Sequence, residues 1–235
     1  METMQAVNCR TAKSSISGDF LDKLSSSARQ DLESIQTPSN LPANKVIFTE
    51  REASRGVYIV LAGEIKLSIN SQDGKRLCLR IARAGEILGL ASTLSGGGYE
   101  LSAETLYPVR TAHIGRTDFL NFLARHPDAY RAVTHELSRH VNIACERLRD
   151  VGLSSSAPEK LARLLLDWSE NGNTTECGTR FRFCLTHEQI GEFIGASRET
   201  VTRTMGQFKD RRLVGFQGSM MTIHNRAALA SYARG

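Results

Sequence analysis

The 235-residue sequence lacks several features that define common classes of protein. No apolar run approaches the roughly 20 residues that a membrane-spanning helix needs. Residues 1–15 have no apolar core of the kind found in signal peptides. No CxxC pair occurs among the cysteines, which favours reduced thiols over a disulfide framework; they are Cys9, Cys78, Cys145, Cys177 and Cys184. These absences predict a globular protein of the cytoplasm that has no membrane partner.

Residue patterns typical of enzyme active sites are also missing. The sequence contains no paired carboxylates, no cluster of metal ligands and no nucleophile–base spacing that would indicate a catalytic centre. His187 and Glu188 stand at a predicted helix start without a partner. We therefore expect no enzymatic activity and no metal site.

The charge balance is mildly basic, with a formal net charge of +5. The excess is +2 over residues 1–150 and +3 over residues 151–235, so the C-terminal part is more basic per residue. Such an excess agrees with contact to nucleic-acid phosphates, but a motif is needed to identify the partner.

That motif lies in residues 185–208, which read LTHEQIGEFIGASRETVTRTMGQF. Thr186 followed three residues later by Gln189 is a capping-box sequence, which predicts the start of a helix. Gly195 is a typical helix stop, and Ser197 is a natural N-cap for a second helix. The stretch therefore predicts two short helices joined by a tight turn.

The second helix has two different faces on a helical wheel. The apolar face contains Val201, Thr204 and Phe208, with Met205 at the border. The other face carries Arg198, Glu199, Thr202 and Arg203. Arginine pairs bidentately with guanine, and a carboxylate accepts from the cytosine amino group. Helix-turn-helix proteins place this part of their second helix in the major groove, so the pattern predicts a DNA-reading helix.

An ordinary helical hairpin with a solvated charged face is the alternative, and the flanking segments argue against it. Residues 180–185 alternate as a half-buried strand would, and residues 213–216 and 220–223 form a predicted hairpin around the turn 217–219. Strand, helix, turn, helix and hairpin in this order predict a winged helix-turn-helix domain.

The N-terminal part has a different texture. Residues 1–18 carry no pattern and are predicted to be disordered, and short helices are expected up to Thr37. From Val46 to Ile114, short alternating runs are separated by glycines and turn signals such as Asp73-Gly74. Short strands at this spacing predict an antiparallel β-roll or barrel, so the fold class is α+β.

A helical period begins at Pro127 and ends near Gly152, where residues 152–158 read as a hinge. Apolar or small residues recur at spacings of four and three, which is a heptad seam: Tyr130, Thr134, Leu137, Val141, Ala144, Leu148 and Val151. The seam predicts a parallel two-helix dimer interface, and a core helix packed on its own roll is the alternative. The predicted domains are a tail (1–18), a roll (19–126), a dimerisation helix (127–152) and a winged helix-turn-helix (153–235).

Taken together, these segments resemble the cyclic-AMP receptor protein/FNR (Crp/Fnr) family of bacterial transcription regulators. The motifs that carry the resemblance are GASRETVTR at residues 195–203 and YIVLAGEIKL at residues 58–67, and it extends over about residues 20–225. The resemblance implies a homodimer that binds a palindromic site on double-stranded DNA and meets RNA polymerase. Two-fold symmetry places the half-sites about one helical turn apart.

The resemblance also implies roles for individual residues. Arg198, Glu199 and Arg203 match the base-reading residues of the family, and the presence of both arginines favours a TGTGA-like half-site over a TTGAT-like one. Thr202 lies on the same predicted face. Three further residues are implied as phosphate contacts, helped by the helix N-termini: Thr186, Ser197 and Thr200.

The effector side departs from the family pattern. Cyclic-nucleotide binders of the family have a glutamate after the glycine that matches Gly89, but this chain has Leu90. They have Arg-Ser-Ala where this chain has Leu101, Ser102 and Ala103. A buried cyclic phosphate would lose its charge-assisted arginine partner. We therefore predict that the roll has lost cyclic-AMP binding in its usual form, with these five residues as the pocket candidates.

The sequence does not identify another effector, because it lacks the residue pattern that an iron–sulfur cluster or haem would need. An iron–sulfur cluster needs several cysteines near the N-terminus, where only Cys9 stands. Haem would need an axial ligand such as His113 or Cys78, and Cys145 beside the seam is a candidate for a redox role. One alternative is a regulator whose roll still responds to a cyclic nucleotide, another small ligand or a redox change. A ligand-binding module with a non-functional DNA head is a further alternative.

Overall fold

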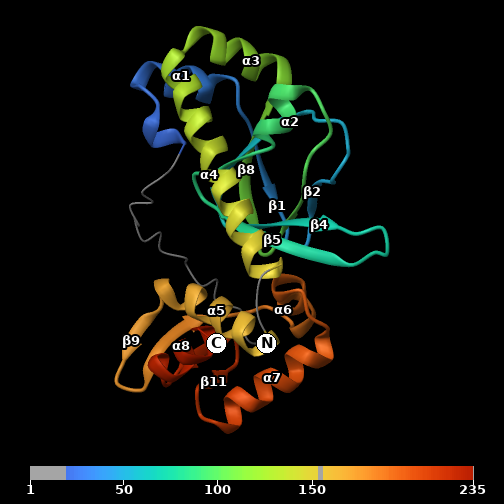
Figure 1. The fold of residues 1–235 in the computed structure, drawn as a ribbon. Coiled ribbons are helices and arrows are strands. Elements are labelled where there is room, and N and C mark those ends of the chain that lie inside the picture. Colours follow the sequence, from blue (N-terminus) through green and yellow to red (C-terminus); the bar gives the residue numbers. More distant parts are fainter. Residues whose placement is uncertain (1–19, 153–155, 235) are drawn as a thin grey trace, which may run out of the picture.

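The computed structural model describes residues 20–152 and 156–234. The predicted N-terminal tail, Cys9 and the middle of the predicted hinge lie outside these residues. A β-rich part, one long helix and a smaller C-terminal part follow one another along the molecule (Figure 1). No helix within the described ranges combines the length and the apolar character needed to cross a bilayer.

Two antiparallel sheets of four strands form the β-roll, as the sequence predicted. Their orders are β1-β8-β3-β6 and β2-β7-β4-β5. The strands are β1 (Thr37–Leu41), β2 (Val46–Phe48), β3 (Gly56–Ala62), β4 (Glu64–Asn70), β5 (Arg76–Arg83), β6 (Ile87–Leu88), β7 (Ser102–Thr105) and β8 (Val109–Gly115). The predicted turn at Asp73-Gly74 joins β4 to β5, which pair along their length.

Short helices accompany the roll: η1 (Leu21–Lys23), α1 (Ser26–Ser34), α2 (Leu90–Ser95) and α3 (Arg116–Arg125). Ser25 caps α1 by accepting a hydrogen bond from the Ala28 amide. The sequence did not predict β1, whose Pro38 lies in an edge strand. Proline is tolerated there because an edge strand has one side that needs no ladder donor.

The long helix α4 (Pro127–Gly152) has two faces with different environments. Ala129, Ala132 and Val133 are buried against the roll, so they anchor the N-terminal half of α4. Seam residues on the other face are exposed, among them Val141 at 62% and Leu148 at 72%. Leu137 of the seam packs against the core of the roll, so the seam contacts the roll in its middle and is exposed at Tyr130 and Leu148 toward its two ends. The side chain of Val151 lies outside the described residues.

Within residues 156–234, the C-terminal head contains a four-stranded sheet of order β11-β12-β10-β9 and four α-helices. Its elements are α5 (Ala157–Trp168), η2 (Ser169–Asn171), β9 (Asn173–Thr175), β10 (Gly178–Arg182), α6 (His187–Ile194), α7 (Arg198–Asp210), β11 (Val214–Gln217), β12 (Met220–Ile223) and α8 (Arg226–Arg234). The order of strand, helix, turn, helix and hairpin confirms the winged helix-turn-helix.

The strand before the first helix of this motif lies earlier than predicted. β10 ends at Arg182, and residues 183–185 lead into α6 outside the regular ladder. Phe183 and Leu185 are nevertheless buried, and the Phe183 amide donates to the Ser219 carbonyl at 2.9 Å. The alternation seen in the sequence therefore reports burial correctly but not the end of the strand.

Candidate nucleic-acid interface and roll cavity

The turn between α6 and α7 is built by side-chain caps. The Thr186 hydroxyl accepts from the Gln189 amide at 3.2 Å, and the Gln189 side chain accepts from the Thr186 amide at 2.9 Å. Gly195 ends α6 in the left-handed conformation, with φ of 65°, and Ser197 caps α7 by accepting from the Thr200 amide. The capping box, the glycine stop and the N-cap predicted from the sequence are confirmed.

Close contact between α6 and the following turn depends on Gly191. A Cβ at this position would lie 2.5 Å from the Ala196 carbonyl oxygen. Any side chain would therefore push the turn away from α6 and change the angle at which α7 is held.

The inner face of α7 packs against the head. Val201, Thr204, Met205 and Phe208 are buried. Met205, which the helical wheel placed at the border, is only 1% exposed, so the packed face is wider than predicted.

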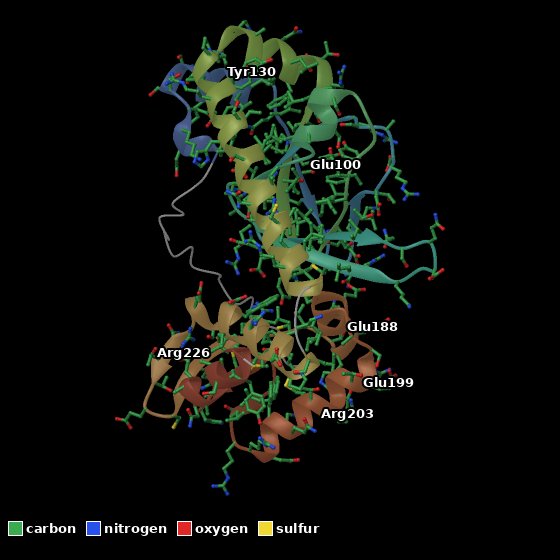
Figure 2. All side chains as sticks on the ribbon, in the orientation of Figure 1. Glu100, Tyr130, Glu188, Glu199, Arg203 and Arg226 are labelled. Atoms are coloured by element: carbon green, nitrogen blue, oxygen red, sulfur yellow. The ribbon has the colours of Figure 1, made fainter. Side chains whose placement is uncertain are left out.

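The outer face of α7 carries the four predicted base-reading residues, and all four are exposed. Glu199 and Arg203 lie on α7 at the outer edge of the head (Figure 2). Among the described residues, no hydrogen bond or ion pair involves the guanidinium of Arg198 or that of Arg203. Both guanidiniums therefore present their donors to an external partner.

Glu199 is held in its ionised form by its place at the helix N-terminus. Hydrogen bonding by its own backbone amide and by the Ser197 side chain lowers the pKa of Glu199. The carboxylate is favoured there because the first turn of a helix leaves backbone donors unpaired. It can act only as an acceptor, as recognition of a cytosine amino group requires.

The Thr202 side chain, unlike those of Arg198 and Arg203, has hydrogen-bond partners within the head. One of them, His187, was not predicted from the sequence. The Thr202 hydroxyl donates to the Arg198 carbonyl at 2.9 Å, and His187 Nδ1 lies 2.8 Å from the same hydroxyl oxygen. His187 was expected to have no partner, because nothing in the sequence shows that the start of α6 meets the second turn of α7. This contact links the two helices on the outer side of the motif.

The predicted phosphate contacts lie at the N-termini of α6 and α7. Thr186 and Ser197 are exposed, and Thr200 is half-buried with its hydroxyl 3.2 Å from that of Ser197. The basic side chains Lys209, Arg211 and Arg212 follow at the other end of α7, and all three are exposed.

The roll contains a cavity of about 490 Å³ between its sheet β2-β7-β4-β5 and the middle of α4. Gly89, Leu90 and Leu101, three of the five predicted pocket residues, line it. Ser102 and Ala103 do not line it; they are buried in β7, where the Ser102 hydroxyl accepts from the Glu50 amide at 3.0 Å. The structure therefore brings the two substituted leucines together in one apolar space.

A network of charged side chains joins the roll to α4 beside this cavity. Glu86 binds Arg80 and Arg139, and Glu136 binds Arg139. His140 Nε2 lies 3.1 Å from a Glu136 oxygen and 2.9 Å from an Arg80 nitrogen. Three possible metal-ligand atoms, from Glu86, Glu136 and His140, lie within 4.8 Å of one another. Because the two arginines already neutralise both carboxylates, the arrangement is a salt-bridge network.

The pKa of Glu136 follows from this network. Burial alone favours the protonated carboxyl, but hydrogen bonds from His140 and Arg139 outweigh it and lower the pKa of Glu136 to about 2. The pKa of Glu86 is lowered in the same way, because Arg80 and Arg139 outweigh its burial.

The two cysteines and the histidine that were considered as sensors lie in three different environments. Cys78 is buried, and burial raises the pKa of its thiol to about 12, which suppresses the reactive thiolate. The rings of His113 and Tyr58 are tilted by 47° with centroids 4.7 Å apart in the roll, and burial lowers the pKa of the imidazole, whose buried Nε2 has no hydrogen-bond partner among the described residues. Cys145 is exposed on α4.

The head is docked on the roll by buried polar contacts. Lys66 of β4 is 2% exposed, and its Nζ lies 2.8 Å from Glu192 of α6. Arg147 of α4 donates to the carbonyls of Cys78 and Leu79 in β5 and to that of Phe193 in α6. One guanidinium thus connects three elements.

Comparison with known families agrees with this architecture. Residues 38–126 match the cyclic nucleotide-binding domain, and residues 159–232 match the Crp-like helix-turn-helix domain. A chain with both is a DNA-binding transcription regulator with a cyclic-nucleotide-type sensor domain. This chain belongs to the Crp/Fnr family.

The relatives extend over most of the chain. The CRP-like cAMP-activated global transcriptional regulator of Mycobacterium tuberculosis is 28% identical over 198 residues, which cover 84% of this chain and 88% of the relative. That relatives of this kind are transcription regulators confirms the expectation that the chain is not an enzyme.

Solved structures show the same fold at low sequence identity. FixK2 from Bradyrhizobium japonicum has a TM-score of 0.72 at 21% identity and covers 84% of this chain and 97% of its own. The c-di-GMP responsive global regulator CLP of Xanthomonas campestris has a TM-score of 0.76 at 17% identity and covers 86% and 100%.

Proposed function

We propose that this protein is a cytoplasmic homodimer that regulates transcription by binding palindromic DNA with TGTGA-like half-sites. Arg198, Glu199, Thr202 and Arg203 read the bases in the major groove. The observation that carries this proposal is the outer face of α7, where two unpaired guanidiniums flank an ionised carboxylate at a helix N-terminus. Bidentate arginine–guanine pairs and a carboxylate–cytosine contact use these groups directly.

Phosphate contacts position the reading helix on the duplex. Thr186, Ser197 and Thr200 lie where the N-termini of α6 and α7 present unpaired backbone amides, which attract anions. Lys209, Arg211 and Arg212 add positive charge at the far end of α7. We expect the bound dimer to meet RNA polymerase, as the family resemblance implies.

Dimerisation uses the seam of α4. Tyr130, Val141 and Leu148 are 52%, 62% and 72% exposed in the single chain. Large apolar side chains in a heptad row on a charged, otherwise polar helix favour burial against a second copy of that helix. Parallel pairing would relate the two heads by a two-fold axis, which is the symmetry of a palindromic site.

Cyclic AMP is not the effector in this proposal. Leu90 and Leu101 lie in the cavity wall where a glutamate and an arginine would have to hold the ribose and the cyclic phosphate. Apolar side chains at both positions leave the phosphate charge without a partner, and burying an unpaired charge is costly.

Selection of bound sites from random duplex DNA tests the proposal. The purified full chain is used with and without cyclic AMP, and the bound sequences are read. A palindrome recovered equally in both arms is the expected result. Recovery of no preferred sequence would contradict the assignment of α7, and recovery only with cyclic AMP would contradict the loss of the nucleotide site.

A second candidate keeps the sensor active: a small ligand other than cyclic AMP binds the roll and gates DNA binding. The observation that favours it is the cavity itself, because seam residues Leu137, Val141 and Ala144 form part of its wall. A molecule bound there would touch the dimer helix directly.

A further inference from the structure

The cavity between the roll and α4 has the size of a small-molecule site. Its volume of about 490 Å³ falls within the range of roughly 300–1,000 Å³ that is usual for ligand pockets. A cyclic nucleotide also fits a space of this size, so volume does not identify the ligand. The chemistry of the wall has to do so.

The wall is apolar on both sides. Leu67 and Leu79 come from the sheet, Leu90 and Leu101 from the segments around α2, and Ile143 from α4. Phe48 and Leu88 close the inner end among the buried core of the roll. An apolar molecule placed here would gain the hydrophobic contribution of every surface it buries, because no part of it has to leave water for an unpaired polar contact.

Three polar side chains reach the wall, and each already has partners. Arg80 donates to Glu86, and its guanidinium lies 2.9 Å from His140 Nε2, which also lies 3.1 Å from Glu136. Glu100 accepts from the Ser92 hydroxyl at 2.7 Å. Arg80 is thus neutralised by Glu86, and the Glu100 carboxylate adds a negative charge to the wall.

This distribution of charge disfavours an anion. A phosphate or carboxylate would have to draw Arg80 out of the salt-bridge network that includes Glu86 and Arg139, and it would be repelled by Glu100. Breaking such a network at a half-buried site costs more free energy than breaking an ion pair at the surface. A cation would in turn have only Glu100 as a counter-charge.

We propose that the cavity binds an uncharged, largely apolar small molecule, held between the leucines of the roll and the seam residues of α4. The binding itself follows from the cavity wall alone, whereas its effect on transcription rests on the function proposed above. Because Leu137, Val141 and Ala144 contribute to both the cavity and the seam, an occupied cavity fixes the helix that pairs the two copies.

The test uses the full-length protein and N-phenyl-1-naphthylamine, an uncharged apolar dye whose emission rises when it leaves water. We expect saturable binding at one dye per chain, with no displacement by cyclic AMP. Leu101→Glu places a charge in the wall and is expected to weaken dye binding at least tenfold. Leu61→Glu, which changes a half-buried leucine of the roll outside the cavity, is the matched control and is expected to keep it.

A second variant keeps the test decisive if Leu101→Glu disturbs folding. Ala91→Trp fills the cavity from an exposed position with an apolar group, so it is expected to weaken dye binding by a similar factor while the circular dichroism spectrum stays unchanged. Equal dye binding by the protein and both cavity variants, absence of saturable binding, or displacement of the dye by cyclic AMP would each overturn the proposal.

A second copy of the chain is the competing occupant. Tyr130→Glu combined with Leu148→Glu charges the ends of the seam without touching the cavity wall. Dye binding that is absent in the wild-type dimer and emerges in this variant would mean that the partner fills the cavity, which also overturns the proposal. If dye binding is absent but sequence-selective DNA binding is intact, only the cavity proposal fails. If dye binding is intact but sequence-selective DNA binding is absent, only the proposed function fails.

Discussion

The outer face of α7 and the wall of the roll cavity differ in chemical character: the first is charged and the second is mainly apolar. On α7, Arg198, Glu199 and Arg203 are charged and exposed, and the two guanidiniums have no hydrogen bond or ion pair to another described residue. In the cavity, Leu90 and Leu101 are apolar where a nucleotide site would carry charge, and Arg80 is consumed by a salt-bridge network. The comparison teaches that the chemistry of the outer face of α7 and that of the cavity wall depend on different residues, so one can change while the other stays the same.

The largest expected effect comes from separating the two copies. Tyr130→Glu combined with Leu148→Glu places charges in the seam and is expected to give monomers that no longer bind a palindromic site. Analytical ultracentrifugation measures the oligomeric state, and a DNA mobility-shift assay measures binding. Ser138→Glu combined with Asn142→Glu, at exposed positions of α4 outside the seam, is the control. Dimers that survive the seam changes would disprove the interface.

Placing charged side chains in the cavity wall should restore affinity for cyclic AMP. Leu90→Glu combined with Leu101→Arg supplies the two side chains that the cyclic-nucleotide pattern requires, and we expect cyclic-AMP affinity to rise at least tenfold over the starting protein. Isothermal titration calorimetry measures it. The exchanged pair, Leu90→Arg with Leu101→Glu, carries the same charges in the wrong places and should gain nothing. Equal affinity in both pairs would refute the proposed geometry.

Removing one guanidinium from the reading face should have a local effect on specificity. Arg203→Ala is expected to weaken binding to the selected site by about 1–3 kcal/mol and to relax preference at one base pair. Arg110→Ala, which removes an exposed arginine from the roll, is the control. Competition with single-base variants of the site separates the outcomes: a uniform loss on every sequence would make Arg203 a phosphate contact.

The smallest expected effect is the acid dependence of the network that anchors α4. The lowered pKa of Glu136, about 2 against 4.5 in the unfolded chain, means that its ionised form stabilises the fold. This contribution is present above pH 4.5 and is lost as the pH falls toward 2. Glu136→Gln should therefore flatten the loss of unfolding free energy in this window, whereas Glu33→Gln at an exposed position should not. Urea unfolding at several pH values measures it.

The sequence predicted best what local chemistry determines. The caps at Thr186 and Ser197 and the stop at Gly195 depend on residues within a few positions, so the turn of the DNA-binding motif could be placed correctly. The strand β1 was missed because residues 37–41 do not alternate in polarity; four of the five are exposed, and long-range pairing with β8 alone makes them a strand.

Contacts between distant segments could not be predicted. The bond between His187 and Thr202 and the ion pair between Lys66 and Glu192 join residues whose proximity follows from tertiary packing. The apolar character of Leu90 and Leu101 was visible in the sequence, whereas the satisfied state of Arg80 was not. The partners of Arg80, which disfavour an anion, become visible only when β5 and α4 are packed together in the fold.

The three hydrogen bonds of Arg147 set a mechanical condition on the dimer. The carbonyl of Leu79, a residue of the cavity wall, and the carbonyl of Phe193, in the DNA-binding motif, are held by the same side chain. We expect that a shift of β5 on ligand binding would also move α6, because the same guanidinium holds both elements. In a dimer, such a shift would change the distance between the two α7 helices, and the helical repeat of DNA converts distance into base pairs. The preferred number of base pairs between the two half-sites would then depend on the state of the roll.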